Sequence, residues 1–154
     1  MADSPAAGDR APAFHLATQT GEKIRLSSFK GRKVLVFFYP KADTPGCTTQ
    51  ACGLRDIADE IDDTVILGIS PDQPDKLAKF DEKYGLGFTL LSDPEHKASE
   101  AYGVWAEKSM YGRKYMGIVR SAFLIDEKGK VEVAWPKISP KDTPTNLLKA
   151  LRQG

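Results

Sequence analysis

Two stretches of almost unbroken apolar residues constrain the fold of this chain more than any other feature. Lys33–Tyr39 (KVLVFFY) is β-branched, aromatic and nearly continuously apolar, and Thr64–Ser70 (TVILGIS) repeats the pattern. Such runs are typical of strands buried on both faces of a parallel sheet. Between them, Cys47–Ile61 carries apolar residues at helical spacing, namely Leu54, Ile57, Ala58 and Ile61. This order predicts a parallel βαβ unit with a right-handed crossover.

Shorter elements are expected on either side of this unit. The pattern predicts strands near Ala13–Leu16, Lys23–Leu26 and Phe88–Leu91, a turn at Ser27–Gly31, and helices at Pro74–Tyr84 and near Lys97–Tyr102. Near the end of the chain it predicts a hairpin pairing Ile118–Ile125 with Lys130–Trp135, and a helix capped by Thr143 with Pro144 at its first position. These elements together predict an α/β, thioredoxin-like fold, with a mixed central β-sheet flanked by helices and an N-terminal β extension.

The length and charge of the chain limit its number of domains and the kinds of partner it can bind. Its 154 residues predict a single domain over 1–154, with residues 1–11 as a loosely ordered leader. A formal charge of +1, from 22 basic and 21 acidic residues, argues against nucleic acid or an anionic membrane as the partner. No apolar run approaches the roughly 18 residues of a transmembrane helix, and no secretory signal is visible, so a cytoplasmic protein is expected.

The chain contains two cysteines, Cys47 and Cys52. Two thiols alone cannot form a structural zinc site, and His15 and His96 lie in no ligand-spaced motif. Both histidines are expected at the surface or in turns, and no metal site is predicted. The cysteines themselves could be small buried hydrophobic residues, because free cysteine is often buried.

The position of Cys47 favours a reactive thiol instead. It follows Thr44-Pro45-Gly46, directly after a buried strand and in the first turn of the next helix. Open α/β sheets carry their chemistry beyond the carboxyl ends of the strands. The positive end of the helix dipole also lies there and favours the thiolate, which is the nucleophilic form.

The spacing of the two cysteines restricts how they can pair. In a continuous helix, residues five apart have Cα atoms separated by about 8.6 Å, beyond the limit of roughly 7 Å for a disulfide. A static disulfide is therefore not expected, whereas a transient one that unwinds the first helical turns is plausible. The spacing also differs from the C-x-x-C pattern of thioredoxin-type dithiols.

The residues around Cys47 suit oxidation by a peroxide, which requires hydrogen-bond donors, exclusion of water and a fixed cation. Thr44 offers a hydroxyl three residues before the thiol, and Pro40 and Pro45 stiffen the loop and remove backbone donors. Arg120, on the predicted strand GIVRSAFLID, is the candidate cation. The alternative for Arg120 is a solvated residue at a strand edge.

At this point the sequence resembles a known family. The segment FFYPKADTPGCTTQACGLRD resembles the active-site segment of peroxiredoxins, in particular the Q-type, or bacterioferritin comigratory protein, subfamily. The resemblance covers nearly the whole chain, because GDRAPAF, LGISPDQPDKLAKF, FTLLSD, AYGVWAEKSMYGRKYMGI and RSAFLIDEKGKV fit the same pattern.

The resemblance implies a role for each candidate residue. Cys47 would be the peroxidatic nucleophile and Cys52 the resolving cysteine. Thr44 would hydrogen-bond the peroxide and the thiolate, Pro40 would shield the sulfur from water, and Arg120 would fix the thiolate and polarise the O–O bond. Two departures from the family pattern are Ala122, often a small hydroxyl residue, and Ile138–Asn146, which lacks a Gly-His-Ala sequence.

The implied reaction is a thiol peroxidase cycle without metal, haem or flavin. Hydrogen peroxide or an organic hydroperoxide would oxidise Cys47 to a sulfenic acid, and Cys52 would convert it to an intramolecular disulfide, which thioredoxin or a similar dithiol would reduce. Because both cysteines belong to one chain, a monomer is expected. The alternatives are a thiol–disulfide oxidoreductase without peroxidase activity and a non-enzymatic binding domain with incidental cysteines.

The segment between the helix predicted near Lys97–Tyr102 and the predicted hairpin allows two interpretations. Trp105, Met110, Tyr111 and Tyr115 could line an apolar mouth that favours alkyl hydroperoxides, although a satellite packing cluster is the preferred interpretation. The cations Lys108, Arg113 and Lys114 are interpreted as a solvated face.

Overall fold

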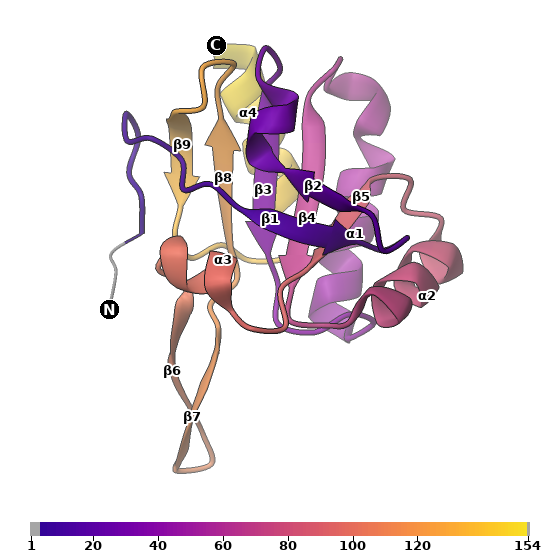
Figure 1. The fold of residues 1–154 in the computed structure, drawn as a ribbon, viewed down its shortest axis with the longest axis vertical. Helices are drawn as coiled ribbons and strands as arrows, with labels where there is room; N and C mark the ends of the chain where they lie inside the picture. Colours follow the sequence, from indigo (N-terminus) through magenta and orange to yellow (C-terminus); the bar gives the residue numbers. More distant parts are fainter. Residues whose placement is uncertain (1–3, 154) are drawn as a thin grey trace.

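The computed structural model describes residues 4–153, and a seven-stranded mixed sheet forms its centre, in the order β2-β1-β5-β4-β3-β8-β9 (Figure 1). Strand β3 (Val34–Phe38) pairs in parallel with β4 (Val65–Ser70), which pairs in parallel with β5 (Thr89–Ser92). Helix α1 (Pro45–Asp56) joins β3 to β4, which confirms the predicted βαβ unit. On its other side, β3 pairs antiparallel with β8 (Ser121–Ile125).

The sheet edges are antiparallel. At one edge, β1 (His15–Thr18) pairs with β5 and with β2 (Lys23–Arg25), forming the expected N-terminal extension. At the other, β9 (Val131–Trp135) pairs with β8. Where a turn was expected after β2, the chain forms a short 3-10 helix, η1 (Leu26–Phe29).

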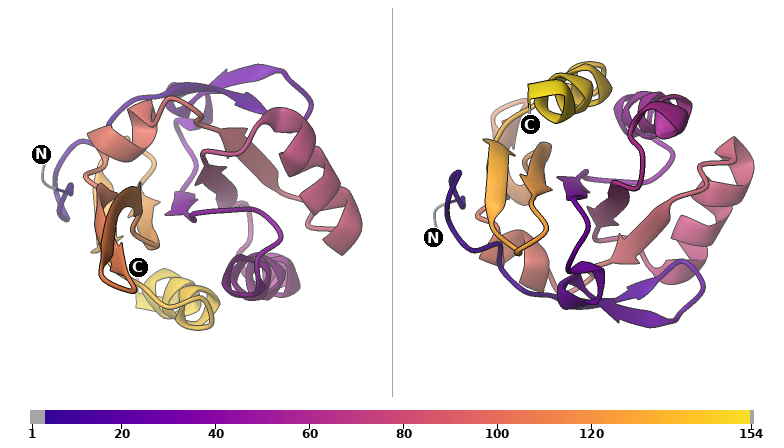
Figure 2. Two further views of the ribbon diagram at one scale, coloured as in Figure 1. Left: turned by 90° about the horizontal axis from the view of Figure 1, so that it is seen from below. Right: turned by 90° about the horizontal axis from the view of Figure 1, so that it is seen from above.

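The sheet is covered on both faces, as Figure 2 shows from its two ends. Leu35 and Phe37 of β3 belong to one core cluster, together with residues of α1, α2 (Pro74–Tyr84) and α4 (Asp142–Gln153). The alternating residues Val34, Val36 and Phe38 belong to a second cluster, on the side of α3 (Lys97–Ala101) and the N-terminal segment. Two packed faces explain the continuous apolar pattern of β3, because successive side chains point to opposite sides.

Two predicted helix boundaries are wrong. Helix α1 ends at Asp56, not at Ile61, and a 3-10 turn, η2 (Ala58–Glu60), follows it. Helix α4 begins at Asp142, so Thr143 lies inside its first turn and does not cap it. The Thr143 hydroxyl instead donates a hydrogen bond to the carbonyl of Ser139 (3.0 Å).

The predicted strand Ile118–Ile125 is interrupted before β8. The amide of Val119 donates to the carbonyl of Val104 (2.8 Å), and the carbonyl of Arg120 accepts from the amide of Ile138 (3.0 Å). Because of these long-range bonds, Val119 and Arg120 do not take part in the hydrogen-bond ladder of the sheet. Arg120 consequently lies in a connection between two strands and not on a strand.

A second sheet, a hairpin of β6 (Trp105–Met110) and β7 (Arg113–Ile118), projects from the body of the molecule (Figure 1). At the tip of this hairpin, Tyr111 is 98% exposed and Met110 is 55% exposed. These two residues therefore neither line an apolar mouth nor belong to a packing cluster. At the base of the hairpin, Trp105 stacks on His96 with ring centroids 3.7 Å apart.

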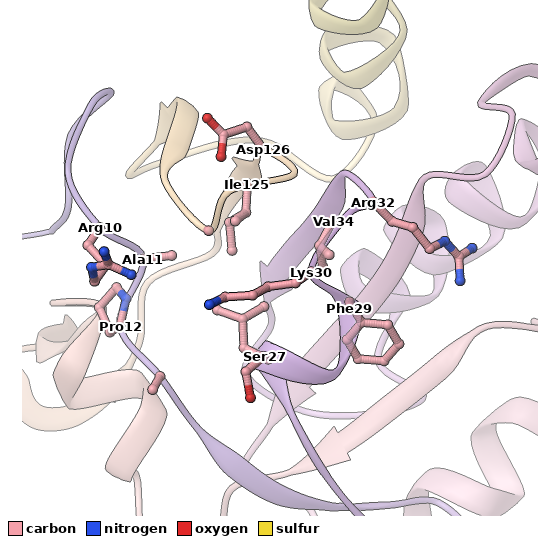
Figure 3. Close-up of a pocket in the computed structure, with 13 residues that line it drawn as sticks. Arg10, Ala11, Pro12, Ser27, Phe29, Lys30, Arg32, Val34, Ile125 and Asp126 are labelled. Atoms are coloured by element: carbon pink, nitrogen blue, oxygen red, sulfur yellow. The ribbon is translucent and has the colours of Figure 1, made fainter.

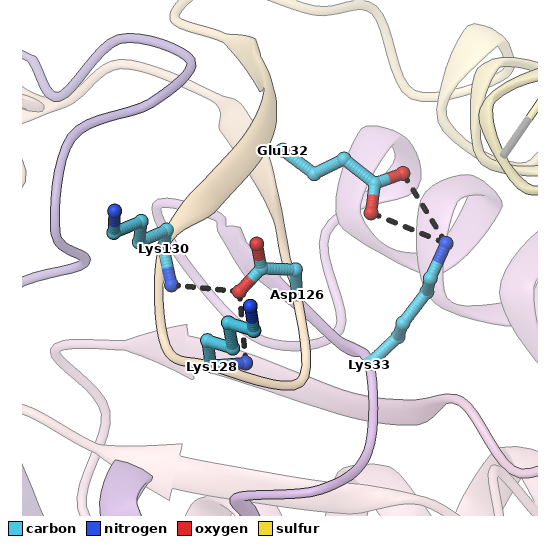
Figure 4. Close-up of polar contacts among 5 residues, drawn as sticks. All are labelled: Lys33, Asp126, Lys128, Lys130 and Glu132. Atoms are coloured by element: carbon cyan, nitrogen blue, oxygen red, sulfur yellow. Dashed lines mark hydrogen bonds and ion pairs between the residues drawn. The ribbon is translucent and has the colours of Figure 1, made fainter.

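The end of the sheet at the start of β3 is held by local polar contacts. The Asp126 carboxylate accepts hydrogen bonds from the amides of Lys128 and Lys130 in the β8–β9 turn, and Lys33 forms an ion pair with Glu132 (Figure 4). The amide of Gly8, in the predicted leader, donates to the carbonyl of Val131 (2.8 Å). Within the described part of the chain, no helix has the length and apolarity needed to cross a membrane.

Candidate active site

Cys47 lies where its position in the sequence predicts. It is the third residue of α1, which follows the carboxyl end of β3, and its side chain is only 1% exposed. Thr44 precedes the helix in an extended conformation, and Pro45 occupies the first position, where a missing N–H costs no hydrogen bond. The sulfur therefore lies in the first helical turn, where the helix dipole favours negative charge.

Arg120 supplies a fixed cation to this sulfur. Both terminal guanidinium nitrogens, Nη1 and Nη2, donate to the Cys47 Sγ at 3.4 Å. The neighbouring Gly46 leaves room for them, because a Cβ atom at Gly46 would lie 3.0 Å from Nη2. Arg120 thus makes the expected contact, and the solvated-edge alternative is wrong.

A row of hydrogen-bonded polar side chains, not predicted from the sequence, orients Arg120. Its Nη1 also donates to the Oε1 of Gln50 (2.8 Å), and the Nε2 of Gln50 donates to the Oγ1 of Thr143 on α4 (2.9 Å). Gln50 is completely buried. The available signal was its spacing of three residues from Cys47, because residues three apart share a helix face.

Thr44 and Pro40 lie in the connection that leads to Cys47. Both are half-buried. The Thr44 hydroxyl donates to the carbonyl of Lys41 (2.9 Å), so in this structure it is engaged within its own loop and not with the sulfur. Pro40 follows Tyr39, which is almost fully buried, and burial raises the pKa of the Tyr39 phenol far above its usual value. A neutral phenol therefore lies near the sulfur.

The loop before α1 is anchored to the β4–α2 connection and to the end of α2. Asp43, in the left-handed region (φ 62), accepts hydrogen bonds from the Tyr84 hydroxyl (2.6 Å) and the Lys83 ammonium (2.9 Å) at the end of α2. These two contacts, Tyr84 first, hold the pKa of Asp43 below its usual value. The amide of Ala42 donates to the carboxylate of Asp72 (2.7 Å). The start of α1 is thereby fixed relative to α2.

Cys52 is half-buried and lies on the same helix as Cys47. Both cysteines are free thiols within the uninterrupted helix α1. The separation expected for two residues five apart on a helix, about 8.6 Å between Cα atoms, exceeds the reach of a disulfide. A bond between these sulfurs therefore requires part of α1 to unwind.

An apolar cavity of about 330 Å³ lies away from this site, at the opposite end of β3. Figure 3 shows it between the N-terminal segment and the start of β3, with Val34 and Ile125 among its lining residues. It contains none of the predicted site residues.

Comparisons with known proteins agree on one family. The family model described as the AhpC/TSA family matches residues 7–134. The chain is 54% identical over 147 residues to a putative peroxiredoxin Bcp of Haemophilus influenzae, covering 94% of this chain and 95% of the relative. It is 57% identical over 128 residues to peroxiredoxin Bcp of Escherichia coli, covering 82% of each.

A solved structure of a similar fold comes from Xanthomonas campestris. It is the bacterioferritin comigratory protein, described in connection with alkyl peroxide reduction activity. It matches with a TM-score of 0.88 and 32% identity, and the alignment covers 96% of this chain and 98% of that protein.

Proposed function

This chain belongs to the AhpC/TSA family and is a peroxiredoxin, and from that premise we propose how its residues divide the reduction of a peroxide. The contact of both terminal Arg120 nitrogens with the buried Cys47 sulfur is the observation that carries the proposal. A cation and a helix N-terminus acting on one thiol favour the thiolate, which is the form that attacks a peroxide.

In the first step, Cys47 is the peroxidatic cysteine. Its thiolate attacks one oxygen of the O–O bond, so that a sulfur–oxygen bond forms, the O–O bond breaks, and the sulfur is oxidised to a sulfenic acid. The second oxygen takes up a proton and leaves as water or an alcohol. Arg120 stabilises the negative charge that moves from sulfur to the leaving oxygen, and Pro40 limits access of water.

Thr44 is proposed to donate to the bound peroxide once it releases the Lys41 carbonyl. Its hydroxyl lies at the N-terminus of α1, three residues before the sulfur. This role requires the Thr44 side chain to rotate away from the Lys41 carbonyl.

In the second step, Cys52 is the resolving cysteine. Its sulfur attacks the Cys47 sulfenic sulfur, a disulfide forms, and the oxygen leaves as water. Because both residues lie in α1, this step requires local unwinding, which also exposes the disulfide to a dithiol reductant of the thioredoxin kind. That reductant restores both thiols and is itself oxidised to a disulfide.

We also propose that one chain of one domain completes the cycle as a monomer. Both sulfurs and Arg120 come from the same chain, so the chemistry needs no residue of a second subunit. Hydrogen peroxide and organic hydroperoxides are the proposed substrates, and the need for a dithiol reductant favours a reducing compartment such as the cytoplasm.

The test is peroxide consumption in the presence of thioredoxin and its reductase. The native chain consumes peroxide continuously, and Cys47→Ser abolishes turnover. Cys52→Ser reacts once per chain, accumulates sulfenic acid and recycles poorly. A chain that reduces a model disulfide without consuming peroxide would instead be a thiol–disulfide oxidoreductase, and full cycling by Cys52→Ser would remove Cys52 from the resolving role.

A further inference from the structure

The cavity at the start of β3, about 330 Å³ in volume, has no part in the proposed peroxide chemistry. Its walls come from three segments far apart in the sequence, namely the N-terminal segment, η1 with the residues that follow it, and the β8–β9 turn. Backbone hydrogen bonds join these segments. The amide of Ala11 donates to the carbonyl of Gly129 (3.0 Å), and the amide of Gly31 donates to the carbonyl of Glu127 (2.9 Å). The backbone around the cavity is therefore fixed on several sides.

The floor of this cavity is apolar. Leu26, Val34 and Ile125 line it, and all three side chains are buried. They belong to the second core cluster, so an apolar group lying on them would extend the packed core of the protein. The volume is at the lower end of the range of about 300–1,000 Å³ for small-molecule sites, which suits a short alkyl chain or a single ring.

Cations surround this apolar floor. Arg10, Lys30 and Arg32 line the cavity and are exposed, so they lie at its mouth. Arg32 donates to the Asp63 carbonyl through Nε (3.0 Å) and Nη2 (2.8 Å), whereas Lys30 extends across the cavity toward the segment that carries Arg10 (Figure 3). Among residues 4–153, the ion pairs found involve neither Arg10 nor Lys30.

The acidic group beside these cations is engaged elsewhere. Of the described residues that line the cavity, Asp126 alone is acidic. Its Oδ1 accepts hydrogen bonds from the amides of Lys128 (2.9 Å) and Lys130 (3.0 Å), which hold the carboxylate against the β8–β9 turn (Figure 4). The mouth of the cavity therefore carries an excess of positive charge.

We propose that this cavity binds a small amphipathic carboxylate, with its alkyl chain on the apolar floor and its carboxylate between Arg10 and Lys30. Burial of the chain on Leu26, Val34 and Ile125 removes apolar surface from water, and the two cations donate charge-assisted hydrogen bonds to the head group. A neutral ligand would leave both cations without a partner, and a small anion would leave the floor uncovered. The cavity and Cys47 lie at opposite ends of β3, so this binding goes beyond the peroxidase function.

The test is a titration of the reduced, full-length chain with sodium octanoate, followed by proton–nitrogen NMR. We expect saturable binding of one octanoate per chain with a Kd of about 0.1–1 mM, as a ligand of this size allows. The amides of Leu26–Lys30 and Gly129 shift, whereas those between Cys47 and Cys52 do not. Acetate, which lacks the alkyl chain, and 1-octanol, which lacks the charge, each bind at least about tenfold more weakly.

Charge variants test the place of the head group. Arg10→Met and Lys30→Met each weaken octanoate binding about three- to tenfold, because each removes a charged donor, and leave the binding of 1-octanol nearly unchanged. The matched control is Lys128→Met, which removes an exposed cation of the β8–β9 turn that does not line the cavity. It changes the Kd by less than about twofold, since exposed charges at a distance are screened.

Four results would overturn this inference. Shifts that do not saturate, or that lie outside the cavity, show that octanoate has no site there. Equal affinity for acetate shows an adventitious anion site only, and equal affinity for 1-octanol shows an apolar cavity without charge recognition. An equal loss in Lys128→Met shows a general effect of net charge. The titration involves no peroxide, so its outcome and that of the peroxidase assay are independent.

Discussion

At the scale of single residues, the site is a buried sulfur with a cation that is itself held in place. Arg120 contacts Cys47 and Gln50, and Gln50 contacts Thr143 on α4. A flexible arginine would sample many rotamers, and each hydrogen bond to the guanidinium reduces that freedom. The position of the Arg120 guanidinium against the sulfur therefore depends on Gln50, which does not itself contact the sulfur.

Replacing Gln50 tests this dependence. Gln50→Ala removes the acceptor of a hydrogen bond to a charged group, typically worth about 1.5–3 kcal/mol. Part of that loss should appear in the transition state, so we expect the second-order rate with hydrogen peroxide, measured by stopped-flow, to fall about tenfold.

The control for Gln50 is its neighbour Thr49, which is exposed and bonds only the Pro45 carbonyl of its own helix. Thr49→Ala should react at nearly the native rate. Thr143→Val, which removes the other partner of Gln50, should reproduce part of the Gln50→Ala defect. An unchanged peroxide rate in both Gln50→Ala and Thr143→Val would contradict a positioning role for this chain of residues.

At the scale of elements, α1 has two requirements that conflict. Its first turn must be formed to hold Cys47 near Arg120, yet Cys52 can reach Cys47 only when that turn is unwound. Part of the anchoring meets both requirements, because the contacts of Asp43 with Tyr84 and Lys83 before α1 are exposed and such contacts are individually weak.

Oxidation should therefore change hydrogen exchange in α1 selectively. In the disulfide form, amides between Cys47 and Cys52 are expected to lose protection, whereas those of α2 (Pro74–Tyr84) keep it. Exchange measured by mass spectrometry on the reduced and oxidised chain checks this, with Cys47→Ser treated with peroxide as the control. Equal protection of α1 in both forms would show that the disulfide forms without unwinding.

The Asp43 contacts give this loop a pH dependence. The folded pKa of Asp43 lies below its unfolded value, near 3.9, so the stabilisation is fully present above that value and is lost as the pH falls through the folded pKa. Asp43→Asn keeps a residue that tolerates the left-handed backbone at φ 62 but removes the charge.

We expect Asp43→Asn to lower the thermal unfolding midpoint slightly at pH 6, and by progressively less as the pH falls below about 4. The effect is small because the carboxylate is exposed and its pair with Lys83 is screened. Unfolding followed by circular dichroism across this range measures the difference. If the difference in unfolding midpoint between the native chain and Asp43→Asn stays constant with pH, its cause is not the charge of Asp43.

At the scale of the whole molecule, the central sheet is packed tightly on both faces. Gly68 on β4 lies beside Phe37 on β3 and Leu90 on β5. A Cβ atom at Gly68 would lie 2.7 Å from the Phe37 Cζ and 3.1 Å from the Leu90 Cδ2. The missing side chain thus makes room for the ring in the core beneath α1.

Gly68→Ala should therefore lower the free energy of unfolding by about 1–3 kcal/mol through overpacking. Urea denaturation measures this loss. The smaller side chain of Phe37→Leu should relieve the clash, so the double variant should lose less than the sum of the two single losses, by about 0.5–3 kcal/mol. Strict additivity would mean that Gly68 is required for some reason other than the ring of Phe37.

Much of the fold and of the site could be predicted because the signals were local. The apolar runs of β3 and β4 reflect burial of each residue, and the position of Cys47 follows from the strand that ends and the helix that begins beside it. Helix α2 has the predicted bounds, because Pro74 starts it and Gly85, in the left-handed conformation, follows its last residue.

The errors lie where distant segments meet. The break before β8 follows from bonds of Val119 and Arg120 to residues outside the strand. Thr143, predicted as a cap, lies inside α4, where it contacts Gln50 of α1. The hairpin carries exposed aromatic residues, contrary to the usual link between apolar character and burial.

The sequence by itself determined the strand order of the βαβ unit, the position of Cys47 at a helix start, and a spacing of the two cysteines that a formed helix cannot bridge. These properties depend on neighbouring residues, whose solvation and backbone geometry are nearly independent of the rest of the chain. Only the tertiary structure decided which cation contacts the sulfur, and that Gln50 and Thr143 hold that cation in place. Those contacts join residues as many as 93 positions apart, and such pairs meet only after the whole sheet has closed.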